Sequence, residues 1–303
     1  MECGKSLINI GELAKPATVL IEKISDAIGG YFKPYQIRRV AQAEAEAEKI
    51  KALSQIETQM DIAELTQRAL GRFLAEETKK QDNIESITSK ALPLLEADSK
   101  PQEINDDWIT NFFDKCRLVS DEEMQNIWAK VLAGEANSPG KYSKRTVNFL
   151  GSLEKSDAIQ FTILCGFGCI IGIKEIVPMI FEFDKSIYKE HGITFDMLTN
   201  LDDIGLLRFE PSDLAGFLKT CLPKKMRIFY YGIPINIEFM NEENNKLEIG
   251  KVILSRTGRE IAQICDSKPV PGFLDYLIKR WANQELILSS SYPQLPQIPL
   301  PPA

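Results

Sequence analysis

The chain has 303 residues, of which 44% are hydrophobic and 26% are charged, and its formal net charge is −7. This length and composition fit about two globular domains, each able to bury its own core. The negative charge argues against non-specific coating of nucleic acid, which needs a strongly positive field, although it leaves room for a local basic patch.

The cysteines, the single histidine and the N-terminus narrow the class of protein further. Six cysteines are scattered without a CxxC pair, and the chain has one histidine, so we expect no metal site. We also expect no cofactor, and we expect the thiols to be reduced. The N-terminus lacks the apolar stretch of a signal peptide. The most apolar run, residues 161–173, is shorter than the roughly 20 residues of a membrane-spanning helix. We therefore expect a cytoplasmic protein without a transmembrane segment.

Residues 1–33 are expected to form an amphipathic helix segment. Pro16 suits its first turn and Gly29-Gly30 its end, and apolar residues between them recur at helical spacing. One interpretation is that residues 13–31 lie on a membrane surface, which would give peripheral membrane association. The polar face holds acidic as well as basic residues, which suits anionic lipid poorly, so we favour packing against protein.

Residues 34–98 are expected to form a long helical, coiled-coil-like segment. A seam with steps of three and four residues consists of Leu53, Ile56, Met60, Ala63, Gln67, Leu70 and Leu74. An unbroken helix from Tyr35 to Ala91 would be roughly 85 Å long, more than a compact protein of this size can enclose. We expect a helix that ends near Gly71, followed by a second helix. Residues 16–75 would then contact a second copy or another protein.

Residues 99–155 are expected to form a helical core. Asn105 can cap a helix with Trp108 and Phe112 on one face. Ser120 and Glu123 have the spacing of a capping box and precede a helix that carries Trp128. Ser143 can cap the next helix.

The stretch "GEANSPGKYS", residues 134–143, has some features of a phosphate-binding loop but fails its pattern. Five residues separate Gly134 from Gly140, and a tyrosine follows Lys141 where a hydroxyl residue should bind Mg²⁺. We interpret the stretch as a helix–helix connector. Gly134 would end the preceding helix, Pro139 and Gly140 would form a turn, and Glu135 and Arg145 could pair across it.

Residues 156–285 change character and are expected to form a small winged-helix-like α+β domain. "TFDMLTNLDDIGLLRF" predicts a helix that leads into a strand, and "SRTGREIAQIC" and "PGFLDYLIKRWANQ" predict further helices. "MRIFYYGIPINIEF" and "NKLEIGKVILS" are expected to pair as a hairpin. Residues 286–303 are a proline-rich tail that we expect to be disordered. The predicted fold class is therefore mainly α.

The stretch "VSDEEMQNIWAKVLAGEANSPGKYSKRT", with "DWITNFFDKC" before it and "LEKSDAIQF" after it, resembles a family of bacterial proteins known as domain of unknown function 2806. "LIEKISDAIGGYFKPYQIRRVAQAEAEAEKIKA" is similar to the N-terminal segment of that family, so the resemblance spans residues 14–285. It implies a bacterial cytosolic protein and carries over no catalytic residue. Some relatives look like abortive-infection proteins, which implies phage defence.

Three functional hypotheses remain open. The first is a non-enzymatic oligomerising or regulatory protein, because no catalytic constellation is found. The second is nucleic-acid binding by the winged-helix-like domain, disfavoured because the helix that would enter the groove holds three aspartates and no cation. Its possible contacts are Lys224, Lys225, Arg227, Arg256 and Arg259. The third is a membrane-surface effector that uses residues 13–31.

Overall fold

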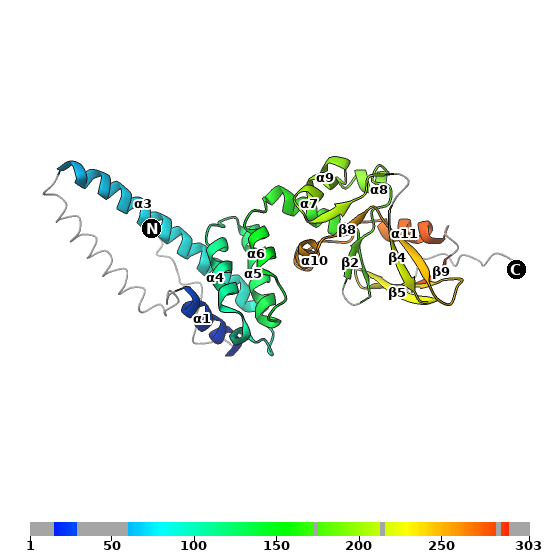
Figure 1. The fold of residues 1–303 in the computed structure, drawn as a ribbon, viewed down its shortest axis with the longest axis horizontal. Helices are drawn as coiled ribbons and strands as arrows, with labels where there is room; N and C mark the ends of the chain where they lie inside the picture. The colour runs from blue at the N-terminus through cyan, green and yellow to red at the C-terminus, as the bar shows by residue number, and fades with distance from the viewer. Residues whose placement is uncertain (1–14, 29–59, 173–174, 213–215, 283–285, 291–303) are drawn as a thin grey trace. The chain divides into compact units, whose positions relative to one another are not determined.

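A computed structural model describes residues 15–28, 60–172, 175–212, 216–282 and 286–290, with the side chains of residues 60–64 and 287–290 left aside. The chain divides into two compact units, Met1–Ser152 (unit 1) and Leu153–Ala303 (unit 2). Figure 1 shows both units with the labels used below. The seam positions Leu53 and Ile56, and residues 291–303 of the expected tail, lie outside the described residues.

The described part of unit 1 is helical. Its helices are α1 (Lys15–Ile28), α3 (Met60–Ala91), α4 (Asp106–Cys116), α5 (Glu122–Asn137) and α6 (Lys144–Leu150), with short 3₁₀ turns at Leu92–Leu94 and Pro101–Glu103. The helix α3 runs through Gly71 without a break, so the expected end near Gly71 is wrong. A glycine in the interior of a helix lowers the stability of the helix by only about 1 kcal/mol. Continuous backbone hydrogen bonding on both sides of Gly71 offsets this loss.

Aromatic side chains fill the core between α4 and α5. Phe112 stacks on Trp108 with ring centroids 5.2 Å apart and meets the edge of Trp128 at 5.1 Å. All three are buried. The indole N–H of Trp108 donates to the carbonyl oxygen of Tyr142 at 2.8 Å, which ties this core to the loop before α6.

A buried polar network fixes the second half of α3 against α5. The side-chain oxygen of Gln125 accepts from the hydroxyl of Ser86 (2.7 Å) and from the ammonium group of Lys90 (2.9 Å). Its amide donates to the carbonyl of Val119 (2.9 Å), and the amide of Asn83 donates to the carbonyl of Arg117 (2.8 Å). Because a slip of either helix would leave buried polar groups unpaired, the network specifies how α3 docks.

Unit 2 combines helices with antiparallel sheets. Its helices are α7 (Lys155–Cys165), α8 (Ser186–Lys189), α9 (Phe195–Asp203), α10 (Arg256–Ala262) and α11 (Phe273–Ala282). Its strands are β1 (Gly168–Ile171), β2 (Glu175–Pro178), β3 (Leu207–Phe209), β4 (Phe217–Leu222), β5 (Lys225–Tyr230), β6 (Ile233–Glu238), β7 (Asn245–Gly250), β8 (Val252–Leu254) and β9 (Ile287–Ser290). One sheet has the order β2-β1-β5-β6-β9, and β3-β8 and β4-β7 form two-stranded sheets.

This strand content overturns the expected mainly α class, because the protein is an α+β fold in which helices dominate. The expected helices α9, α10 and α11 are present, but strands occupy much of the chain around them. Each of these strands has three to six residues and so gives only a weak alternating pattern in the sequence.

The expected hairpin between residues 226–239 and 245–255 is also wrong. The first of these segments is a hairpin by itself, in which β5 pairs with β6 from Lys225↔Glu238 to Tyr230↔Ile233. Tyr231 and Gly232 connect the strands with φ of 46° and 82°. Positive φ at both positions is the geometry of a tight hairpin turn that matches the twist of the strands. The strand β7 pairs with β4 instead.

Candidate protein-interaction surface

The first half of α3 carries large apolar side chains that face solvent. Leu65 is 65% exposed and Phe73 is 58% exposed, and Ala69 between them is exposed as well. Residues four apart lie on one face of a helix, so the three form a single apolar line, which we call the α3 stripe. Figure 1 shows this half of α3 extending beyond the helices α4 and α5 that cover its second half.

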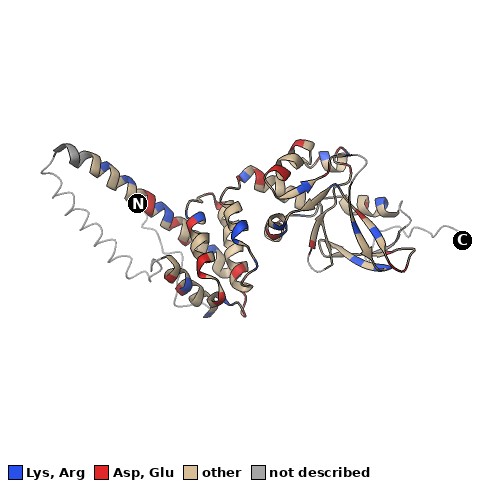
Figure 2. Ribbon diagram, viewed as in Figure 1, with Lys and Arg blue, Asp and Glu red and all other residues tan. Residues whose placement is uncertain are grey.

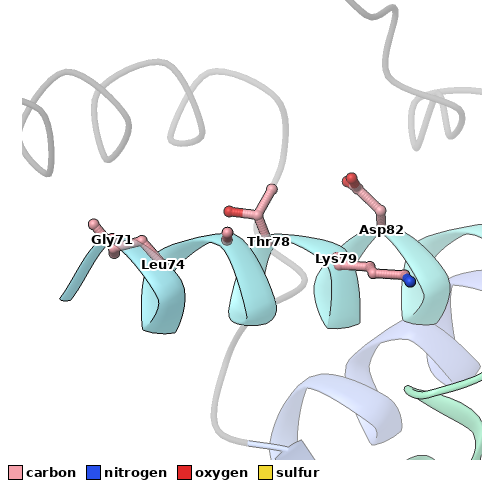
Figure 3. Close-up of a pocket in the computed structure, with 6 residues that line it drawn as sticks. Gly71, Leu74, Thr78, Lys79 and Asp82 are labelled. Carbon is pink, nitrogen blue, oxygen red and sulfur yellow. The ribbon is translucent and has the colours of Figure 1, made fainter. Parts of the chain in front are cut away.

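A shallow hollow lies on a different face of the same helix. It is lined by Gly71, Leu74, Ala75, Thr78, Lys79 and Asp82. The side chains of Thr78 and Asp82 point to the same side of α3 in Figure 3. At about 100° per residue, Thr78 lies about 140° round the helix from Phe73. The hollow therefore continues the expected seam through Leu74, and the α3 stripe is a separate surface.

Sequence reasoning missed the α3 stripe because it followed the seam of three- and four-residue steps. On the described part of that seam, Gln67 is exposed and Leu70 and Leu74 are half-buried. The signal for the stripe was the four-residue spacing of Leu65, Ala69 and Phe73, which the sequence contains but which competes with the seam.

The structure corrects the expected capping box at Ser120. The N-cap of α5 is Asp121, whose carboxylate accepts from the backbone N–H groups of Glu123 (3.0 Å) and Met124 (3.1 Å). A carboxylate at this position also interacts favourably with the positive end of the helix dipole. Asn105 caps α4 and Ser143 caps α6, each by accepting a backbone N–H three residues ahead.

The connector at residues 134–145 differs from expectation at its start. Gly134 does not end α5, which continues to Asn137. A Cβ at Gly134 would lie 2.7 Å from Cε2 of Tyr142, so the glycine is needed because an aromatic ring packs on the helix backbone. Pro139 and Gly140 form the expected turn, in which Gly140 has φ of 86°.

The carboxylate of Glu135 organises this connector. Glu135 is only 2% exposed. Its two oxygens accept from the backbone N–H groups of Gly140 (2.6 Å) and Tyr142 (2.9 Å). Arg145, the expected partner of Glu135, is exposed on the first turn of α6. The loop therefore wraps around a carboxylate of its own chain and has the geometry of a structural connector.

The five cations considered for nucleic-acid contact lie on different elements and have partners. Lys224 pairs with Glu242 at 2.6 Å and Lys225 with Glu238 at 3.3 Å, beside or on β5. Arg227 donates to the side-chain oxygen of Asn236 at 2.7 Å. On α10, Arg256 pairs with Glu260 at 3.1 Å, and Arg259 donates to the carbonyl of Leu254 at 2.9 Å.

These partners reduce the positive field that a nucleic acid would meet. Cations that already pair with carboxylates release fewer counterions from phosphates. Figure 2 shows acidic and basic residues interspersed along both units. Nucleic-acid binding stays a prediction that the structure does not test.

The apolar face of α1 is already covered within unit 1. Ala17, Leu20, Ile21 and Ile24 are buried, and α1 packs against α4 and the turn at Pro101–Glu103. The ammonium group of Lys23 pairs with the carboxylate of Asp106 on α4. A membrane surface would need this same apolar face, so the fold argues against the membrane interpretation of residues 13–31. In the described residues, no helix has both the length and the apolar character needed to span a bilayer.

A charged cluster in unit 2 surrounds Arg280. Its guanidinium lies 4.1 Å from the ring centroid of Phe181 and pairs with Glu182 (2.8 Å) and Glu248 (3.1 Å). Hydrogen bonds from Lys185 and then Arg280 lower the pKa of Glu182. The charges compensate one another across α11, β7 and the loop after β2, which is the arrangement of a structural ion-pair network.

Comparison with protein families identifies the chain. It matches the family described as protein of unknown function (DUF2806) over residues 67–278, more than half of its length. The chain therefore belongs to this family. Comparisons with curated proteins and with solved structures found no match. The family match begins on α3 near the α3 stripe and ends within α11.

Proposed function

We propose that this protein is a non-enzymatic regulatory protein that self-associates through the α3 stripe. The observation that carries the proposal is the exposure of Leu65 and Phe73 on a helix whose second half is anchored in a folded core. Large apolar side chains aligned on one exposed face are typical of protein contact sites. The occupant that we propose is the same stripe of a second copy of the chain.

The symmetry of the stripe supports a second copy as the partner. Leu65 and Phe73 lie four residues before and after Ala69. If two α3 helices lie antiparallel with Ala69 facing Ala69, each Leu65 faces Phe73 of the other copy. The small central residue allows close approach of the helices, and the contact has the self-complementary form of a twofold dimer.

The size of the stripe indicates a weak contact. Covering the exposed parts of Leu65 and Phe73 is worth about 1–2 kcal/mol for each side chain, or about 4–8 kcal/mol for two copies. Association itself costs at least about 4 kcal/mol in lost motion. A contact of this kind is reversible and sensitive to concentration, which suits regulation better than permanent assembly.

Light scattering or sedimentation of the full chain over micromolar to millimolar concentrations tests self-association. We expect the average mass to rise with concentration in the wild type and to stay at the monomer value in Phe73→Glu. The matched control is Gln67→Glu, which adds the same negative charge at an exposed seam position. Gln67 lies about 120° round the helix from Phe73 and so lies off the α3 stripe. A wild type that remains monomeric refutes the proposal. Dissociation by Gln67→Glu but not by Phe73→Glu would assign the contact to the seam.

Cysteine cross-linking tests the orientation of the pair. In a Cys3→Ser/Cys221→Ser background, we expect Leu65→Cys and Phe73→Cys chains to form a mixed disulfide when combined. We expect little disulfide between two Leu65→Cys chains. If two Leu65→Cys chains form the disulfide and the mixed pair does not, the helices lie parallel. Self-association itself would then still hold.

Two finer expectations stay predictions. Phage defence is the process implied by the family resemblance, and no described residue tests it. Nucleic-acid binding predicts a salt-dependent mobility shift that Lys224→Glu/Lys225→Glu abolishes, and no shift at low salt would end that hypothesis.

A further inference from the structure

Two buried cysteines of unit 2, Cys165 and Cys265, lie on neighbouring segments although they are 100 positions apart in the sequence. Cys165 is the last residue of α7, and Cys265 follows α10. Both are free and buried, and each thiol affects the pKa of the other. The thiol of Cys265 also lies 3.5 Å from the carbonyl oxygen of Ala262.

The chain segments that carry the two cysteines are fixed to each other. The hydroxyl of Thr162 donates to the carbonyl of Cys265 at 3.3 Å. The hydroxyl of Tyr230 donates to the carbonyl of Gly166 at 3.0 Å and accepts from the N–H of Val270 at 2.7 Å. Because these bonds join the two segments near both cysteines, Cys165 and Cys265 are held side by side, and a bond between their sulfur atoms needs no large conformational change.

The same turn that connects β5 to β6 supplies a second link. The hydroxyl of Tyr231 lies 3.2 Å from the carbonyl oxygen of Cys165 and 2.7 Å from the hydroxyl of Ser267. Cys265 is 9% exposed, whereas Cys169 is fully buried.

The surroundings divide the chemical roles between the two thiols. Interaction with the thiol of Cys165, with smaller contributions from Ser267 and Thr162, lowers the pKa of Cys265 to about 7. Burial, followed by interaction with the thiol of Cys265, raises the pKa of Cys165. Because the thiolate is the nucleophile, Cys265 is suited to react first and Cys165 to resolve the product.

We propose that Cys165 and Cys265 form a peroxide-responsive dithiol that is oxidised to an intramolecular disulfide. The thiolate of Cys265 attacks one oxygen of hydrogen peroxide, an S–O bond forms as the O–O bond breaks, and the leaving hydroxide takes a proton to become water. The sulfur of Cys165 then attacks the sulfenic sulfur of Cys265. The S–S bond forms, the S–O bond breaks, and the departing hydroxide leaves as water with the Cys165 proton. Two thiols and one peroxide thus give one disulfide and two waters.

Peptide mapping of the full chain without reductant, after brief exposure to hydrogen peroxide, tests this step. We expect a peptide pair linked through Cys165 and Cys265, with the loss of two hydrogens, in the wild type and in the matched control Cys221→Ser. Cys165→Ser should stop at a sulfenic acid on Cys265 that dimedone captures, and Cys265→Ser should give no dimedone adduct at Cys165. A folded wild type without this linked pair, or with Cys265 linked to Cys169, overturns the proposal.

The pH dependence of alkylation separates a reactive pair from two neighbouring structural thiols. In the wild type, the rate at which iodoacetamide labels Cys265 should rise about tenfold between pH 6 and pH 8, as the thiolate forms around pH 7. In Cys165→Ala, the midpoint should move up towards the ordinary thiol value because the thiol of Cys165 is gone. An unmoved midpoint in a folded variant contradicts the assigned roles.

Discussion

The two halves of α3 belong to one continuous helix but meet different surroundings. In the second half, Ile84, Ile87 and Ala91 are buried, and Asn83 joins the polar network with Gln125. In the first half, Leu65 and Phe73 are exposed. Apolar side chains of similar size are thus buried in a core in one half and exposed in the other. The comparison teaches that helical periodicity identifies a face but does not say what covers it.

The largest expected difference between the halves is in amide hydrogen exchange. In dilute protein, amides of residues 84–91 should exchange at least about 10³-fold more slowly than those of residues 66–76. Amides of the second half exchange only when the core unfolds, whereas the first half can open by itself. If the α3 stripe pairs with a second copy, a higher concentration should slow exchange in the first half alone. Equal protection of both halves in dilute protein would break the comparison.

Truncation of one apolar side chain in each half should also separate them. Ile87→Ala removes a fully buried side chain and should lower the free energy of unfolding by about 2–5 kcal/mol. Phe73→Ala changes an exposed position and should alter it by about 0.5 kcal/mol or less. Chemical denaturation followed by the fluorescence of Trp108 and Trp128 measures both. A comparable loss in Phe73→Ala would mean that the first half is part of the core.

A pair of helical glycines gives the smallest and most specific contrast. Apart from the backbone of α3 itself, no atom of the described residues lies within 4 Å of a Cβ built at Gly71, so Gly71→Ala should stabilise the protein by up to about 1 kcal/mol. At Gly134 the Cβ would meet the ring of Tyr142, which is buried, so Gly134→Ala should destabilise by about 1–3 kcal/mol. Thermal melts of both variants show whether each substitution raises or lowers the stability of the protein. Stabilisation by Gly134→Ala would show that the ring of Tyr142 can move aside.

Local signals in the sequence predicted much of unit 1. The caps at Asn105 and Ser143 and the burial of Trp108, Phe112 and Trp128 follow from residue type and helical spacing. The end of α5 was missed because the packing of Tyr142 on Gly134 is a tertiary contact that no local pattern contains. The cap of α5 was placed at Ser120 instead of Asp121 because both residue types are good caps, and only the path of the chain chooses between them.

Unit 2 was harder to predict because its strands are short and pair across long stretches of sequence. The strand β3 pairs with β8 from Leu207↔Leu254 to Phe209↔Val252, and β1 pairs with β5. The tight turn at Tyr231 and Gly232 was readable in principle, because a glycine between two alternating runs is a hairpin signal. The contact between Cys165 and Cys265 was not readable, since it depends on how the ends of α7 and α10 pack.

The sequence by itself determined that the segments of α4, α5 and α6 are helical and that Trp108, Phe112 and Trp128 face inward, because these features depend on interactions within a few residues. The motif around Trp128 was also sufficient to indicate the family to which the chain belongs. Only the tertiary structure decided the α+β class, the partners of the strands, the exposure of Leu65 and Phe73 and the proximity of the segments that carry Cys165 and Cys265. These features arise from contacts between residues far apart in the chain, whose free energies no local pattern records.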